Sequence, residues 1–180
     1  MSDTVKQAAR VEVAIESGAE RPEGGGPEAV KPVAAPYLPR LLNFEDVTVE
    51  GLKDIFEAAA IGARIDDDGE VYANHGLEFP IWVLLDDEQK TITLRTYLSC
   101  REDAPVDELA SYAQRLNDRF HTVQFSGKTY DDDDARLMGS YTIHGRFGIL
   151  VPQLLLTMRR FSSIFIAAVR ETDVDNKFFE

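Results

Sequence analysis

The residues in this sequence that are best suited to chemistry are two runs of aspartate. Residues 66–70 read Asp-Asp-Asp-Gly-Glu, which is similar to the start of a calcium-binding EF-hand loop. Such a loop needs glycine at its sixth position and glutamate at its twelfth. Counted from Asp66, those positions hold Val71 and Leu77. The spacing therefore predicts a solvated turn and not a calcium site.

The second acidic run, residues 131–134, consists of four consecutive aspartates. Adjacent carboxylates repel one another, and side chains at successive positions cannot all face one ion. A cation site or a docking point for a basic peptide is therefore a weaker interpretation than a charged tip between two strands. Such a tip also discourages aggregation between sheet edges. We predict an acidic hairpin tip here.

Histidine and serine show no pattern typical of a metal site or a nucleophile. His75, His121 and His144 fall in three separate segments, and none has a second metal ligand at the close spacing of a zinc motif. Ser126 and Ser140 are not surrounded by the glycines of a nucleophile elbow. The sequence therefore predicts no metal site and no catalytic serine.

The single cysteine and the run of three glycines do not indicate a disulfide, a reactive thiol or a phosphate-binding loop. Cys100 cannot form an internal disulfide, and a lone cysteine at a strand end is expected to be a small apolar side chain. The glycines at residues 24–26 are followed by proline, so they do not form a phosphate-binding loop. We therefore expect a protein that is not an enzyme, with no catalytic residues, no metal and no cofactor.

Charge and length limit the choice of partner. The chain of 180 residues has 32 acidic and 19 basic side chains, which gives a net charge of −13 at pH 7. An acidic surface repels phosphate backbones, so nucleic acid is not expected as a partner. No secretory signal is visible, and no apolar run approaches the roughly 20 residues of a membrane span. We expect a cytoplasmic protein without a membrane partner.

The elements that must hold these residues divide the chain into two parts. Residues 1–43 are rich in Pro, Gly and Ala and predict a disordered N-terminal arm or linker. The alternation of Val11, Val13 and Ile15 with polar residues leaves a short strand or binding motif open there. Residues 44–180 predict a folded domain.

The folded part has the pattern of an α+β domain in the order α-βββ-α-ββ-α. Thr48 is the expected cap of a first helix that stops at Gly62, and Ala104 and Pro105 open a second helix. The last helix is predicted over residues 151–171. Strands are predicted at residues 70–74, 79–85, 91–98, 122–127 and 137–144. We expect a mainly antiparallel five-stranded sheet packed with the helices.

Two elements carry more apolar side chains than a single hydrophobic core on one side of them can bury. Leu155, Ile166 and Val169 widen the apolar stripe of the last helix, whose main residues are Leu154, Met158, Phe161, Phe165 and Ala168. Trp82 points away from its neighbours Ile81 and Val83, so both faces of that strand are apolar. Such a strand is covered by the chain's own helices, by its tail, by another chain or by a ligand.

Residues 44–180 resemble the YbjN family, described as candidate bacterial sensory transduction regulators. The resemblance rests on residues 48–52 (Thr-Val-Glu-Gly-Leu), 66–70, 116–120 (Leu-Asn-Asp-Arg-Phe) and 145–149 (Gly-Arg-Phe-Gly-Ile). It implies a fold like that of the type III secretion chaperones and no catalytic residues. The chain differs in lacking a second asparagine after Asn117 and a Gly-Gly-Val-like start to the last helix.

The sequence as a whole favours a non-enzymatic, cytoplasmic protein-binding domain. We expect a regulator of sensory transduction or a chaperone-like adaptor, with a protein partner whose identity the sequence does not give. A homodimer formed through the last helix or a sheet edge is also expected. The alternative is a small-molecule sensor or an enzyme with a pocket between the last helix and the sheet.

Overall fold

The computed structural model describes residues 40–130 and 134–179. Six strands form its antiparallel main sheet: β2 (Gly62–Ile65), β3 (Val71–His75), β4 (Ile81–Asp86), β5 (Thr91–Ser99), β6 (Gln124–Thr129) and β7 (Ala135–His144). They are ordered β2-β3-β4-β5-β7-β6 across the sheet. The expected antiparallel α+β architecture is confirmed, with six strands where five were predicted.

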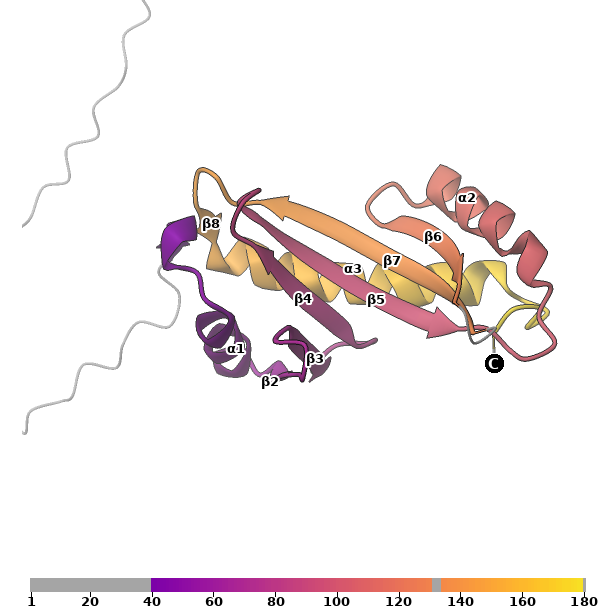
Figure 1. Ribbon diagram of the computed structural model, residues 1–180, viewed down its shortest axis with the longest axis horizontal. Helices are drawn as coiled ribbons and strands as arrows, with labels where there is room; N and C mark the ends of the chain where they lie inside the picture. Colours follow the sequence, from indigo (N-terminus) through magenta and orange to yellow (C-terminus); the bar gives the residue numbers. More distant parts are fainter. Residues whose placement is uncertain (1–39, 131–133, 180) are drawn as a thin grey trace, which may run out of the picture. The chain divides into compact units, whose positions relative to one another are not determined.

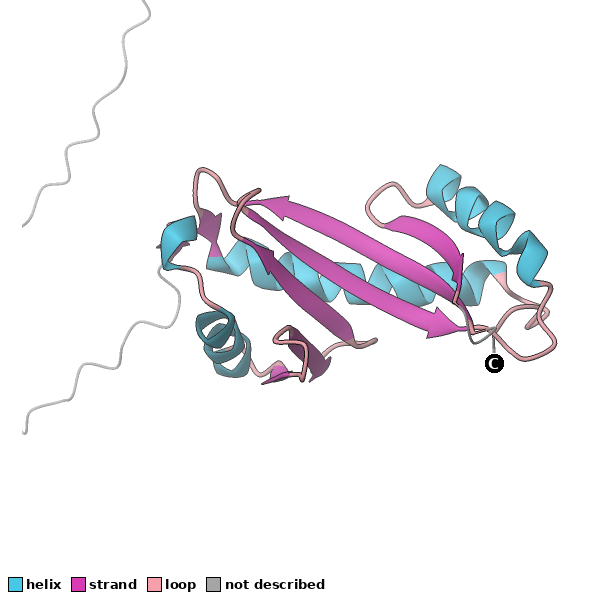
Figure 2. Ribbon diagram, viewed as in Figure 1, coloured by secondary structure: helices cyan, strands magenta, loops and turns pink. Residues whose placement is uncertain are grey.

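Three helices accompany the sheet: α1 (Val49–Ala58), α2 (Leu109–Arg119) and α3 (Val151–Thr172). Figure 1 shows α3, the longest helix, running behind β4, β5 and β7, and Figure 2 separates helices from strands by colour. The Thr48 hydroxyl accepts the Gly51 N–H at 3.0 Å, so the predicted cap of the first helix is confirmed. No helix in the described part of the chain is long and apolar enough to cross a membrane.

The core lies between the helices and one face of the sheet, which we call the core face. Ile81, Val83 and Leu94 alternate along their strands with outward residues and are at most 1% exposed. The predicted stripe of α3 meets them and is equally buried, which confirms it: Leu154, Met158, Phe161, Phe165 and Ala168. All three helices contribute to this single core.

Strand β2 is the strand that the sequence does not predict. The sequence predicts that Gly62 stops the first helix, but Gly62 begins β2. The helix ends earlier, at Ala58, and Ala60 turns the chain with a φ of 59°. A four-residue strand that begins at a helix boundary has too few alternating positions to be recognised from its pattern.

Two further boundaries differ from the predictions. The second helix begins at Leu109 and not at Ala104, because the chain around Pro105 is not helical and continues into a 3-10 turn, η2 (Val106–Glu108). A short ladder pairs β1 (Leu41–Leu42) with β8 (Ile149–Leu150). Residues 41–42, which the sequence placed in the N-terminal arm, therefore form a strand.

The rest of the predicted arm, residues 1–39 with Val11, Val13 and Ile15, lies outside the described residues. So do residues 131–133 of the predicted acidic tip. The two strands on either side of that tip, β6 and β7, are paired in antiparallel register from Gln124 to Thr129, as a hairpin requires.

The chain after α3 folds back and is held in place by hydrogen bonds to the carboxylate of Asp173. Asp173 accepts N–H bonds from Lys177, Phe178 and Phe179 at 2.9 to 3.2 Å. Phe178 and Phe179 are 2% exposed, and Phe178 stacks on Tyr112 of α2 with 4.7 Å between ring centroids. This C-terminal hook fastens the end of α3 to α2.

Candidate binding face of the sheet

The face of the sheet opposite the core face carries a row of three aromatic rings on adjacent strands. Tyr72 of β3 and Trp82 of β4 have ring centroids 4.8 Å apart and ring planes tilted by 54°. Trp82 and Tyr97 of β5 are also 4.8 Å apart, with planes only 19° from parallel. We call this side the open face and these three rings the aromatic row.

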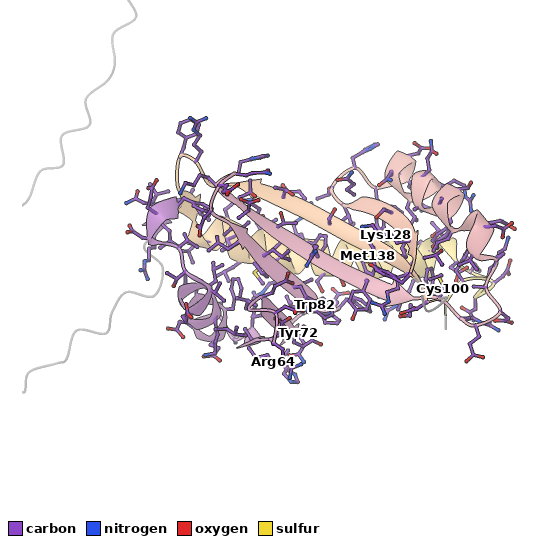
Figure 3. The ribbon with its side chains drawn as sticks, viewed as in Figure 1. Arg64, Tyr72, Trp82, Cys100, Lys128 and Met138 are labelled. Atoms are coloured by element: carbon purple, nitrogen blue, oxygen red, sulfur yellow. The ribbon has the colours of Figure 1, made fainter. Side chains whose placement is uncertain are left out.

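An arginine stands at each end of the aromatic row. The Arg64 guanidinium of β2 lies 5.0 Å from the centre of the Tyr72 ring, and that of Arg136 on β7 lies 4.8 Å from the centre of Tyr97. Because β5 lies between β4 and β7, Trp82 and Arg136 occupy opposite sides of Tyr97. Each ring therefore has a side-chain neighbour from the strand on either side of it, and Figure 3 places Arg64, Tyr72 and Trp82 next to one another.

A second group of side chains continues the open face beyond Arg136. Tyr130 is 40% exposed, its ring centre lies 4.9 Å from the Arg136 guanidinium, and its hydroxyl donates to the sulfur of Met138 at 3.9 Å. Lys128 of β6 is exposed and lies opposite Arg136 in the strand register. Figure 3 places Lys128 and Met138 together on this side of the sheet.

The open face is more basic than the acidic chain as a whole. Its strands carry four basic side chains: Arg64, Arg95, Lys128 and Arg136. Glu70 pairs with Arg95 at 2.8 Å, and Asp134 pairs with Arg136. The hydrogen bond that Arg136 donates to the Asp134 carboxylate raises the pKa of Arg136 above its ordinary value. Arg95 and Arg136 are thus each paired with a carboxylate, whereas Arg64 and Lys128 are exposed.

No described helix crosses in front of the open face at β4, β5 and β7 (Figures 1 and 3). Tyr72, Trp82 and Tyr97 are only partly buried, whereas core-face residues such as Val71 and Ile81 are fully buried. The sequence left open whether helices cover both sides of the Trp82 strand. Within the described residues, helices cover one side only.

The outer edge of β6 is closed to an added strand. The Asn117 side chain of α2 donates to the Phe125 carbonyl at 2.9 Å and accepts the Phe125 N–H at 2.7 Å. These are backbone groups that an extra strand would need. At Gly127 on the same strand, the backbone of Leu109 lies so close that an added Cβ would be 3.0 Å from it. A partner at this side of the sheet therefore meets the face and not the edge.

The residues that the sequence singled out for chemistry are not brought together. Asp66 accepts the N–H groups of Asp68 and Glu70, which confirms the turn predicted for residues 66–70. His75, His121 and His144 are exposed on separate elements. Among residues 40–130 and 134–179, no three His, Cys, Asp or Glu side chains are grouped to hold a metal ion.

Cys100 lies at the end of β5 in a setting that suppresses reactivity. Burial, together with the nearby carboxylates of Asp134 and Asp173, raises the pKa of its thiol to about 11. A thiol with so high a pKa is a poor nucleophile at neutral pH. The prediction of a small apolar role is consistent with this setting.

The outer stripe of α3 is less open than the sequence suggests. Val169 is 5% exposed, Leu155 is partly buried against the core, and Ile166 is half-buried. A hollow of about 360 Å³ does lie between α3 and the sheet, lined by residues that include Phe79, Leu98, Ile166 and Phe179. It occupies the place expected for the alternative small-molecule pocket.

Sequence reasoning found Trp82 but missed the other members of the open face. Tyr97 alternates with buried residues along β5, and that alternation alone indicates that it points away from the core. What the sequence does not give is the strand order, which places β3 and β5 on either side of β4. Without the strand order, Tyr72, Trp82 and Tyr97 have no reason to be neighbours.

Comparison with solved structures gives the fold its name. YbjN of E. coli, described as a candidate transcription regulator, superposes with a TM-score of 0.62 and 16% sequence identity, over 74% of this chain and 96% of YbjN. The chain has a YbjN-like fold. The expected resemblance is thereby shown at the level of architecture, since identity this low supports the fold alone.

Two other solved structures are similar to the YbjN-like fold of this chain. An uncharacterized protein from Methanothermobacter thermautotrophicus has a TM-score of 0.52 and 10% identity, over 72% of this chain and 99% of that one. The HopA1–SchA chaperone–effector complex has a TM-score of 0.46 and 17% identity, over 67% of this chain and 91% of that one. No protein-family model and no curated protein matches the sequence.

Proposed function

We propose that this chain is a non-enzymatic, cytoplasmic protein-binding domain, a regulator or chaperone-like adaptor, and that it binds its partner with the open face of the sheet. The observation that carries the proposal is the aromatic row of Tyr72, Trp82 and Tyr97. It lies on a face that no described helix covers. A YbjN-like fold is compatible with this role but does not specify it.

The residue types on the open face support binding of protein. Tyr, Trp, Met and Arg are enriched in protein interfaces, and Trp, Tyr and Arg are the side chains whose removal most often costs binding energy. Trp82, Tyr97, Arg136 and Met138 lie together here, and Tyr130 adds a further exposed ring. The rings are already packed against one another, so little conformational entropy is lost when a partner binds.

The test is affinity capture with the full chain and matched variants. Trp82→Ala/Tyr97→Ala removes the centre of the aromatic row, and Arg160→Ala changes an exposed residue of α3 as a control. A protein retained by the unaltered chain should be retained by Arg160→Ala and lost at least tenfold with the double variant. Circular dichroism checks that the double variant is folded. Equal retention by both variants would overturn the proposal.

The second candidate function is a small-molecule sensor that uses the hollow between α3 and the sheet. Its volume of about 360 Å³ falls within the range of ligand pockets, and its lining combines apolar side chains such as Phe79, Leu98 and Ile166 with the polar Arg170, Asp173 and Asn176. Thermal-shift screening with metabolites tests this function. Stabilisation by a small molecule that disappears in Ile166→Trp, where the larger side chain fills the hollow, favours the sensor. Stabilisation that persists in this variant counts against it.

The homodimer expected from the sequence stays a prediction. Light scattering of the full chain should give about twice the monomer mass of 20.1 kDa. A mass near the monomer value at high concentration would remove this expectation. The proposed partner-binding role does not depend on the dimer.

A further inference from the structure

We infer that the open face binds a proline-rich polypeptide segment in the polyproline II conformation, which crosses the strands along the aromatic row. The inference rests on the proposed function and names the chemistry of the partner. Four features of the row support it: the free hydrogen-bond donors, the arrangement of the rings, their spacing and the charge at the Arg64 end.

The aromatic row offers hydrogen-bond donors that the described chain does not use. The hydroxyls of Tyr72 and Tyr97 and the indole N–H of Trp82 make no hydrogen bond to described residues, and no buried side-chain polar atom there lacks a partner. These three donors therefore reach solvent. A polyproline II segment has no internal hydrogen bonds, so its carbonyl oxygens are free to accept from such donors.

The orientation of the rings disfavours flat ligands. Trp82 stacks on Tyr97 and has the tilted Tyr72 ring 4.8 Å away on its other side, while the guanidinium groups of Arg64 and Arg136 lie over the two tyrosine rings. A nucleobase stacks on an open ring face, and these neighbours compete with it for the ring faces of the row. The edges of aromatic rings carry partial positive charge, which attracts carbonyl oxygens.

The spacing of the row matches the polyproline II repeat. Tyr72 and Tyr97 lie on either side of Trp82 with 4.8 Å between neighbouring ring centroids, so the two tyrosine rings are at most about 9.6 Å apart. A polyproline II helix repeats every three residues, or about 9.3 Å. Prolines at positions i and i+3 of a segment laid across the strands would therefore lie over Tyr72 and Tyr97, with Trp82 between them.

The charge at one end of the row gives the segment a direction. Arg64 is exposed, and no described acidic side chain pairs with it, whereas Arg95 and Arg136 are already paired with Glu70 and Asp134. An acidic residue next to the first proline would find its complement at Arg64. The partner segment is therefore expected to read acidic residue, proline, two variable residues, proline.

The single tryptophan of the chain makes the test direct, because the emission of Trp82 reports on occupancy of the row. The full chain is titrated with the peptide Glu-Pro-Ala-Ala-Pro-Ala-Ala-Pro-Ala, which contains no aromatic residue. The matched control peptide, Glu-Pro-Pro-Pro-Ala-Ala-Ala-Ala-Ala, has the same composition without the three-residue period. We expect a saturable change in emission with the first peptide and binding at least about fivefold weaker with the control.

Variants connect the signal to the proposed contacts. Tyr72→Phe/Tyr97→Phe keeps the rings and removes the two hydroxyl donors, so binding should weaken by about three- to tenfold. Arg64→Gln should weaken binding to a similar extent, whereas the α3 variant Arg160→Gln should not change it. Absence of a saturable change, equal binding of both peptides, or unaltered binding in the hydroxyl variant overturns the inference.

Other occupants are separate outcomes of the same assay. Saturable binding of an oligouridylate that requires Arg64 and the two hydroxyls would overturn the inference in favour of nucleic acid. An emission change in the free full chain on Pro36→Ala/Pro39→Ala would identify the chain's own proline-rich segment as the occupant and would also overturn it. If affinity capture depends on Trp82 while the peptide does not bind, the proposed function stands and only this inference fails.

Discussion

Trp82 and Tyr97 stack across two neighbouring strands, with ring centroids 4.8 Å apart and planes 19° from parallel, on the side of the sheet that faces away from the core. A strand whose buried side is already filled by Ile81 and Val83 does not need a large aromatic residue on its other side. Aromatic rings on an uncovered face are a feature of interaction surfaces. This pair is therefore the centre of the proposed binding face.

The stacked pair makes a testable contribution to stability. We expect Tyr97→Ala to lower the free energy of unfolding by about 1–2 kcal/mol, because the stacking contact with Trp82 and the contact with Arg136 are both lost. Tyr97→Phe keeps the ring and should remain close to the unaltered protein. Urea unfolding followed by Trp82 emission measures both. Equal losses in the two variants would contradict a role for the ring.

The close packing of α3 on the sheet predicts the effect of one methyl group. A Cβ added at Gly139 would lie 2.6 Å from Cδ2 and 2.9 Å from Cε2 of Phe165, in the middle of the core. Gly139→Ala is therefore expected to destabilise the domain by about 1–3 kcal/mol. Ser140→Ala, one residue along and pointing to the open face, is the matched control and should have a small effect. Thermal unfolding of both variants gives the comparison.

The C-terminal hook depends on the Asp173 carboxylate. Asp173→Ala leaves the N–H groups of Lys177, Phe178 and Phe179 without their acceptor, and we expect a loss of about 2–4 kcal/mol. Asp175→Ala, at an exposed position in the same turn, should change stability by less than about 0.5 kcal/mol. Chemical denaturation measures both variants. Equal denaturation midpoints for Asp173→Ala and Asp175→Ala would contradict a stabilising role for the C-terminal hook.

Cys100 should be slow to react while the protein is folded. Its pKa of about 11 lies two pH units above the ordinary value of 9.0, so at pH 8 its thiolate fraction is about 100-fold lower than that of an unperturbed thiol. Alkylation by iodoacetamide should be correspondingly slow in buffer and fast in urea. Rapid alkylation of the folded chain would contradict this setting.

The same pKa has a consequence for stability at high pH. The unfolded thiol loses its proton near pH 9, whereas the folded thiol keeps it up to about pH 11. Deprotonation therefore favours the unfolded state over this window, and stability should fall as the pH rises from 9 to 11. Cys100→Ala should show a smaller fall than the unaltered chain, measured by urea midpoints across that range.

Most of the fold could be predicted from local patterns. The stripe of α3 from Leu154 to Ala168, the cap at Thr48 and the hairpin around Trp82 follow from periodicity and capping preference, which are properties of neighbouring residues. Strand β2 and the start of α2 at Leu109 were not predicted correctly. In both places the pattern predicts a helix boundary at a glycine or proline, whereas Gly62 begins a strand and Pro105 precedes a 3-10 turn.

The candidate site could be predicted only in part. The sequence identifies Trp82 as a residue with no place in the core, because it is out of phase with Ile81 and Val83. It cannot show that Tyr72 and Tyr97 flank it, because that depends on pairings between strands that are set by the whole sheet. The bonds between Asn117 and Phe125 that close the β6 edge likewise depend on how α2 packs.

The central claim, that the open face is where a protein partner binds, is tested most directly by site-specific photo-crosslinking in the cell. A photoreactive phenylalanine derivative is placed at Ser140, on the open face of β7, and in a matched variant at Gln153, on the exposed side of α3. We expect crosslinks to a second protein from position 140 that are lost with Trp82→Ala, and none from position 153. Crosslinks from position 153 alone would contradict it.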